Sequence, residues 1–160
     1  EFRKMWRFRQ QLTKSECEII LSKAASGTLA LLGDDGYPYA VPKVMYMLTA
    51  SYIFIAPKRV KGDAIRQHDK ASFCVIAADD IHPTEFTTYF RSVIAFEKIQ
   101  IIESESERIC AVPLLGDRYN PVDDVGLQKE LGKGLSHMLI PLLDIEHLTG
   151  KEAIELMRKK

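Results

Sequence analysis

The sequence has little that would hold a metal, a disulfide or a polyanion. Its 160 residues include 22 basic and 22 acidic side chains, so the formal net charge is zero, and this balance gives no sign of a nucleic-acid partner. The three cysteines, Cys17, Cys74 and Cys110, are far apart and form no CxxC pair, and the four histidines show no ligand spacing. Neither a disulfide framework nor a metal site is therefore predicted.

Long apolar runs are also missing. No stretch approaches the roughly 20 apolar residues that a membrane-spanning helix needs, and no signal peptide is recognisable. We therefore expect a cytoplasmic protein with reduced thiols and no membrane partner. Hydrophobic residues make up 46% of the chain and charged residues 28%, as in an ordinary globular protein. The length favours a single domain over residues 1–160.

The stretch from Tyr52 to His68 is the most informative part of the sequence. An apolar, β-favouring run, Tyr52–Ala56, is stopped by Pro57, and residues 63–68 read as a short helix. Three cations lie between them: Lys58, Arg59 and Lys61. A strand that leads through a basic turn into a helix favours a phosphate, because free N–H groups and the helix dipole attract an anion. The alternative is a solvated charged turn, which the spacing alone favours.

The N-terminal part predicts an arm and a helix. Phe2–Gln11 is basic and aromatic, which indicates an arm. Thr13 and Glu16 have the spacing of a capping box, and the helix that they open should end near Ser26 and Gly27.

The strands that follow predict an antiparallel sheet. Residues 28–32 read as a buried strand and residues 33–36 as a hairpin turn. Residues 37–48 read as a long strand made irregular or edge-like by Pro38 and Pro42.

Further strands are expected over 71–76, 87–96 with a continuation to 102, and 137–145. Helices are expected over 108–115, after a capping box from Ser104 to Glu107, over 125–136, and from a capping box at Thr149 to Glu152 through Met157. Loops are expected over 77–85 and 116–124. Because strands and helices do not alternate regularly, we expect a mainly β, α+β fold: an antiparallel barrel or bent sheet with helices at its ends.

Catalytic residues cannot be assigned from the sequence. Ser136 and His137 are neighbours in the chain and therefore point apart. Arg91 and Ser92 follow two aromatic residues in a strand, where they either face solvent or serve a site. The strand over 39–48 is apolar on both faces apart from Lys43, so we expect a second subunit to cover one face.

Six short segments, in their order and spacing, carry a family resemblance. They are Gly27-Thr-Leu-Ala30, Asp35-Gly-Tyr-Pro-Tyr-Ala-Val-Pro42, Lys61-Gly-Asp-Ala-Ile65, Phe73-Cys-Val75, Phe86-Thr-Thr-Tyr-Phe-Arg-Ser-Val93 and Glu146-His-Leu-Thr-Gly-Lys-Glu-Ala153. Together they resemble the FMN-binding split β-barrel family related to pyridoxamine 5'-phosphate oxidase, in particular its nitroimidazole-resistance (Nim) type.

The resemblance implies an antiparallel split β-barrel of the FMN-binding type, capped by helices and assembled as a homodimer with flavin sites at the subunit interface. It implies that the basic turn holds the FMN phosphate, with Lys61 matching the family's lysine. The implied cofactor-binding residues are Pro42, Lys43, Val44, Met45, Ile55, Ala56, Arg59 and Lys61. In some members of the family the flavin carries a two-electron reduction of a small substrate.

The sequence departs from the family pattern at the flavin site. Val44 stands where a small hydroxyl residue is common, Ile55 where a histidine is common, and Arg59 where a glycine is common. The leading hypothesis is a Nim-like flavoprotein that binds FMN, with a reductase activity as its catalytic form. The alternative is a non-catalytic dimeric split barrel that has lost the flavin or binds another small ligand. Haem binding is a third interpretation.

Overall fold

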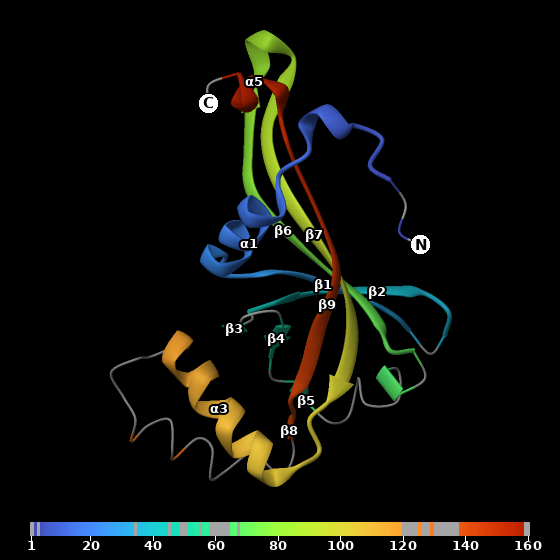
Figure 1. Cartoon of the computed structure of the whole chain (residues 1–160), viewed down its shortest axis with the longest axis vertical. Coiled ribbons are helices and arrows are strands. Elements are labelled where there is room, and N and C mark those ends of the chain that lie inside the picture. Colours follow the sequence, from blue (N-terminus) through green and yellow to red (C-terminus); the bar gives the residue numbers. More distant parts are fainter. Residues whose placement is uncertain are drawn as a thin grey trace.

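The computed structural model describes residues 2, 4–33, 35–44, 46–48, 51–54, 56–57, 65–66, 68–119, 125, 129 and 138–158. The strands are β1 (Gly27–Leu32), β2 (Pro38–Lys43), β3 (Tyr46–Met47), β4 (Ser51–Ile53), β5 (Ala56–Pro57), β6 (Lys70–His82), β7 (Thr87–Ile101), β8 (Met138–Leu139) and β9 (Pro141–Glu152). The helices are the 3-10 turns η1 (Phe8–Gln10) and η2 (Pro83–Glu85) and the α-helices α1 (Lys14–Lys23), α3 (Glu105–Tyr119) and α5 (Ile154–Met157). Seven strands form one antiparallel sheet in the order β2-β1-β6-β7-β9-β4-β3, and β5 pairs with β8 (Figure 1).

The strand order requires a strongly curved sheet. β2 and β3 are its two edges, yet only Val44 and Met45 separate them in the chain. This short link reaches roughly 11 Å, so the sheet must bend round to bring its edges close together. Within the described residues β2 and β3 do not pair, and the barrel stays open along this seam. The predicted antiparallel barrel with helices is thus confirmed in a split form.

The long strand predicted over residues 37–48 is wrong as a single element, because it divides into β2 and β3. Pro38 and Pro42 both lie on the edge strand β2, where a missing N–H need not interrupt the ladder. The predicted hairpin turn is confirmed. The Gly33 N–H donates to the Tyr37 carbonyl at 2.8 Å, and Gly36 has a φ of 81°, which favours glycine.

β6 and β7 are longer than the sequence predicts, and the loop expected over 77–85 is wrong. β6 continues to His82, with a register shift between Ile76 and Ala78. The far end of the β6–β7 hairpin projects beyond the other strands, next to α5 (Figure 1). A two-stranded ribbon of this kind is mostly exposed, so its polar sequence resembles that of a loop.

The remaining predicted elements have mixed outcomes. β7 runs on to Ile101 as expected, and α3 extends to Tyr119, into the predicted loop over 116–124. The strand predicted over 137–145 is found as β8 and the start of β9. The helix predicted over 125–136 lies outside the described residues except at positions 125 and 129. Of the helix predicted over 63–68, only residues 65, 66 and 68 are described.

The N-terminal capping box is confirmed. The Thr13 side-chain oxygen accepts from the Glu16 N–H at 3.3 Å, and the Glu16 carboxylate accepts from the Thr13 N–H at 2.8 Å. The C-terminal capping box is wrong, because Thr149 and Glu152 lie in β9. There β9 pairs with β7, and this long-range ladder prevails over the local capping pattern. α5 begins instead at Ile154 and has no side-chain cap.

These two threonines give a matched stability test. Thr13→Ala should lower the free energy of unfolding by roughly 1 kcal/mol, because it removes the N-cap of α1. Thr149→Ala should cost less than about 0.5 kcal/mol, since Thr149 makes only a 3.5 Å hydrogen bond to the Ile94 carbonyl. Urea unfolding of the two variants measures the difference, and equal losses would contradict it.

One face of the sheet carries the main core. Its buried side chains include Leu29, Phe73, Val93, Ala95 and Leu143, and α1 adds Cys17 and Leu21. No helix in the described part of the chain is long and apolar enough to cross a bilayer.

Candidate functional site

The ends of β2 and β4 meet at a lysine and a phenylalanine. Lys43 is the last residue of β2, and its Nζ lies 5.6 Å from the centre of the Phe54 ring, which follows β4 and is fully buried. The alternation of β2 explains the contact. Val41 pairs with the core residue Leu29, so Val41 and Lys43 share the core-facing side. A cation over the face of an aromatic ring is attracted by its quadrupole.

The structure brings together part of the predicted cofactor site. Pro42 and Lys43 are in β2, Val44 follows directly, and Ala56 is in β5, where it pairs with Leu139. Among the described residues, the end of β2 and Phe54, which follows β4, adjoin through the Lys43–Phe54 contact. The other four predicted residues, Met45, Ile55, Arg59 and Lys61, lie outside the described residues.

The described residues on either side of positions 58–64 contact the rest of the fold. Pro57, in β5, pairs with Met138, and Ile65 is buried in the core. Arg66 forms a 3.7 Å ion pair with Glu103, just before α3. Lys43 forms no ion pair with any carboxylate of the described residues, so its charge remains available to an anion. No cluster of metal-ligating side chains occurs in the described part.

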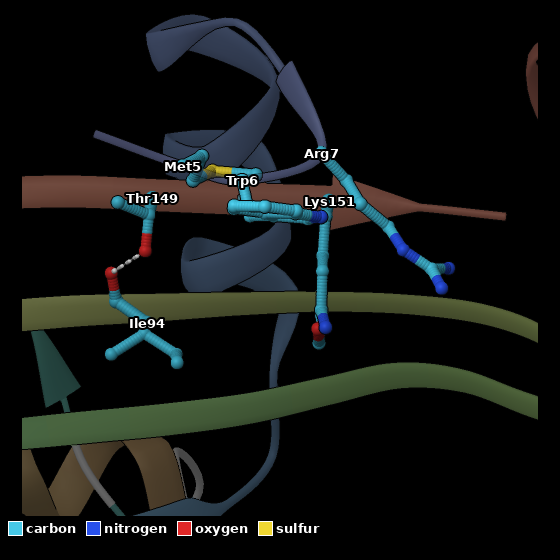
Figure 2. A pocket seen from close by; sticks show the side chains of 8 residues that line it. Met5, Trp6, Arg7, Ile94, Thr149 and Lys151 are labelled. Carbon is cyan, nitrogen blue, oxygen red and sulfur yellow. Dashed lines mark hydrogen bonds between the residues drawn. The ribbon is translucent and has the colours of Figure 1, made fainter. Parts of the chain in front are cut away.

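A second concave region, which the sequence analysis did not identify, lies under the N-terminal arm. A cavity of about 330 Å³ is bordered by arm residues on one side and by β7 and β9 on the other (Figure 2). Its lining is Met5, Trp6, Arg7, Ser92, Ile94, Thr149, Gly150 and Lys151. The basic and aromatic composition of the arm was the one signal in the sequence.

Two buried carboxyl groups were also missed. Glu97 in β7 is 1% exposed, and neither of its carboxyl oxygens has a hydrogen-bond partner among the described residues. Burial raises the pKa of the Glu97 carboxyl from 4.5 to about 8. Glu152 in β9 is equally buried, but its Oε2 accepts from the Arg91 Nε at 2.8 Å. The sequence left open whether Arg91 faces solvent or serves a site. In the structure Arg91 pairs with the buried carboxylate of Glu152.

Solved structures with the same fold are similar to this chain. A candidate 5-nitroimidazole antibiotic resistance protein from Bacteroides thetaiotaomicron has a TM-score of 0.69 and 15% identity, over 88% of this chain and 85% of that one. An FAD and heme binding protein from Mycobacterium smegmatis has a TM-score of 0.71 and 21% identity, over 90% and 73%. A flavocytochrome from Azotobacter vinelandii has a TM-score of 0.75 and 15% identity, over 94% and 72%.

These similarities support the split β-barrel fold predicted from the sequence. The matching structures also include pyridoxamine 5'-phosphate oxidase-related proteins. No protein-family model matches the chain, and no curated protein matches it in sequence.

Proposed function

We propose that this chain is a flavin-binding split-barrel protein whose cofactor is FMN. The observation that carries the proposal is the contact of Lys43 with Phe54. It places a cation, which has no acidic partner among the described residues, beside a residue two positions before β5. The similarity to an FAD and heme binding protein and to a flavocytochrome supports it.

The residues present fit such a cofactor. Lys61 and Arg59 would bind the phosphate, because an ammonium and a guanidinium both pair well with phosphate oxygens. Residues 42–45 and 55–56 would form the walls beside the ring system, with Lys43 keeping positive charge at that wall. When bound, the flavin supplies the redox chemistry, and the chain supplies binding, orientation and electrostatics. In its catalytic form the protein would reduce a small substrate.

A phosphate contact can be separated from general damage to the site. Lys61→Met should weaken FMN binding roughly ten- to a hundredfold, since hydrogen bonds to charged groups contribute about 1.5–3 kcal/mol. Riboflavin, which lacks the phosphate, should bind the variant and the wild type alike. Flavin-fluorescence titration measures both ligands, with Arg59→Met as the parallel variant and Lys14→Met, on the exposed surface of α1, as the control.

The same titration can reject the flavin. A wild-type protein that purifies without FMN and does not bind it at tens of micromolar would favour the alternative, a non-catalytic barrel. A Soret band in the purified protein would instead indicate haem.

We further propose a homodimer. The β1–β2 hairpin exposes the apolar surface of Leu32, Tyr37 and Tyr39, with Tyr37 74% exposed, and a second subunit would cover it. The interface should exceed about 2,000 Å², as in obligate dimers. Light scattering that gives a monomer mass at micromolar concentration would contradict the dimer.

A further inference from the structure

The N-terminal arm is fixed to β9 at two places. At one end the Leu12 N–H donates to the Gly150 carbonyl at 2.8 Å, and Gln11 forms a bridge with Lys151. At the other end the Phe2 ring stacks on His147, with the ring centres 4.5 Å apart. The arm is therefore held on the sheet at both ends.

The arm is longer than the strand segment that it accompanies. Residues 147–151 of β9 extend over roughly 14 Å, whereas an extended chain from residue 2 to residue 11 could reach about 30 Å. The extra length leaves space beneath the arm. Two cavities are found there, of about 330 and 390 Å³, and both are lined by Met5 and Thr149.

The floor of the first cavity is the outer face of the sheet. Ser92 and Ile94 alternate along β7 with Val93, which faces the core, so their side chains point to the other side. Figure 2 shows the Lys151 side chain crossing from β9 over β7, and its Nζ lies 5.3 Å from the centre of the Phe90 ring.

Among the described residues, the lining carries positive charge and aromatic surface but no carboxylate. The cations are Arg7 and Lys151 in the first cavity and Lys4 in the second. None of the three forms an ion pair within the described part of the chain. The aromatic residues are Trp6, which is 95% exposed, and Phe2, Phe8 and His147. Cations without acidic partners, next to exposed aromatic rings, favour a planar anion.

We propose that the cavity under the arm binds a planar aromatic carboxylate of one or two rings. The ring would stack on Trp6, and Lys151 and Arg7 would pair with the carboxylate, while Ser92 offers a hydroxyl donor. The volume of the first cavity, about 330 Å³, is at the small end of the range of ligand sites, about 300–1,000 Å³, and suits a ligand of one or two rings. The proposal does not depend on the flavin, whose proposed residues are on other elements.

The chain provides its own probe, because Trp6 is its single tryptophan. Titration with 2-naphthoate should quench the Trp6 fluorescence to saturation. The neutral 2-naphthamide should bind at least tenfold more weakly, and so should cyclohexanecarboxylate, which keeps the charge but lacks the aromatic ring. Inorganic phosphate tests whether any anion suffices, and it should not displace 2-naphthoate at equal concentration.

Variants of the two cations test whether 2-naphthoate binds in the first cavity. Lys151→Met should weaken 2-naphthoate binding about tenfold or more and bring it to the level of 2-naphthamide, while Lys14→Met should leave it unchanged. Circular dichroism of Lys151→Met confirms that the variant is folded, and Arg7→Met, in the arm, gives a second test that does not alter the sheet. Equal binding of acid and amide, displacement by phosphate, or equal losses in Lys151→Met and Lys14→Met would overturn the proposal. FMN titrations of the same variants have a separate readout, so failure of one site is distinguishable from failure of the other.

Discussion

Replacing Glu97 with glutamine should stabilise the protein by roughly 3–5 kcal/mol at pH 8 and by much less at pH 5. Glu97 is 1% exposed, and its cross-strand neighbours, Ala71 and Ile145, carry no charge. Burial raises the pKa of this carboxyl from 4.5 to about 8, because a charged carboxylate is poorly solvated in an apolar interior.

The pKa of Glu97 is higher in the folded protein, at about 8, than its ordinary value of 4.5, and this difference sets the direction of the pH dependence. Between about pH 4.5 and 8 the folded protein keeps the Glu97 proton and the unfolded chain releases it. Stability contributed by this group therefore falls as pH rises, by about 1.4 kcal/mol per pH unit. Glutamine cannot ionise, so this contribution to the pH dependence disappears in the variant.

Denaturant unfolding of wild type and Glu97→Gln at several pH values between 5 and 8 measures the effect. Glu97→Met, which removes the polar group as well, should be more stable than wild type at both ends of the range, because the buried polar oxygens have no partner among the described residues. A constant difference between wild type and Glu97→Gln across the pH range would show that Glu97 does not titrate in this way.

Replacing Arg91 with methionine should have the opposite effect and cost roughly 3 kcal/mol. Arg91 and Glu152 are direct cross-strand partners, and an Arg91 Nη lies 2.7 Å from the Glu152 Oε2. Removing the arginine takes the cationic partner from a carboxylate that is 1% exposed, and such losses cost about 3–5 kcal/mol. We expect the low end, because the Arg91 side chain is 34% exposed.

Two controls separate this effect from the loss of any surface charge. Arg66→Met removes a pair with Glu103 whose side chains are 57% and 76% exposed, and it should cost less than about 1 kcal/mol. The double variant Arg91→Met, Glu152→Met should recover most of the lost stability, because an apolar pair can replace a buried ion pair. Equal losses in Arg66→Met and Arg91→Met would contradict the burial argument.

The capping-box patterns at Thr13 and Thr149 show how far the sequence could predict the fold. Thr13 and Glu16 form a box, while Thr149 and Glu152, with identical spacing, lie in a strand. The different outcomes of the two patterns depend on long-range packing, not on the local sequence. The first pattern precedes a helix that can pack on the sheet, whereas the second lies where β9 completes its pairing with β7.

The candidate site was predictable in its parts but not in their arrangement. The choice of Lys43 and its neighbours came from the sequence and the family resemblance. The predicted strand ends were wrong, because the strand expected over 52–56 is found as β4 and β5, and Pro57, expected to stop it, is in β5. Pro42 indicated an irregularity in the strand predicted over 37–48, but not that the strand divides into β2 and β3 after Lys43. Glu97 had a usable signal, because it continues the inward alternation of Val93 and Ala95.

The short link between β2 and β3 has a consequence for how the protein resists aggregation. Both edges of the seven-stranded sheet carry unpaired backbone groups that could join the strands of another chain, and the link keeps these edges facing one another. Cutting the chain between Val44 and Tyr46, or inserting a flexible segment there, would leave the strand pairing intact but let the edges separate. The opened sheet would then present two templates for strand addition, so we expect such a variant to aggregate edge to edge more readily than the intact chain.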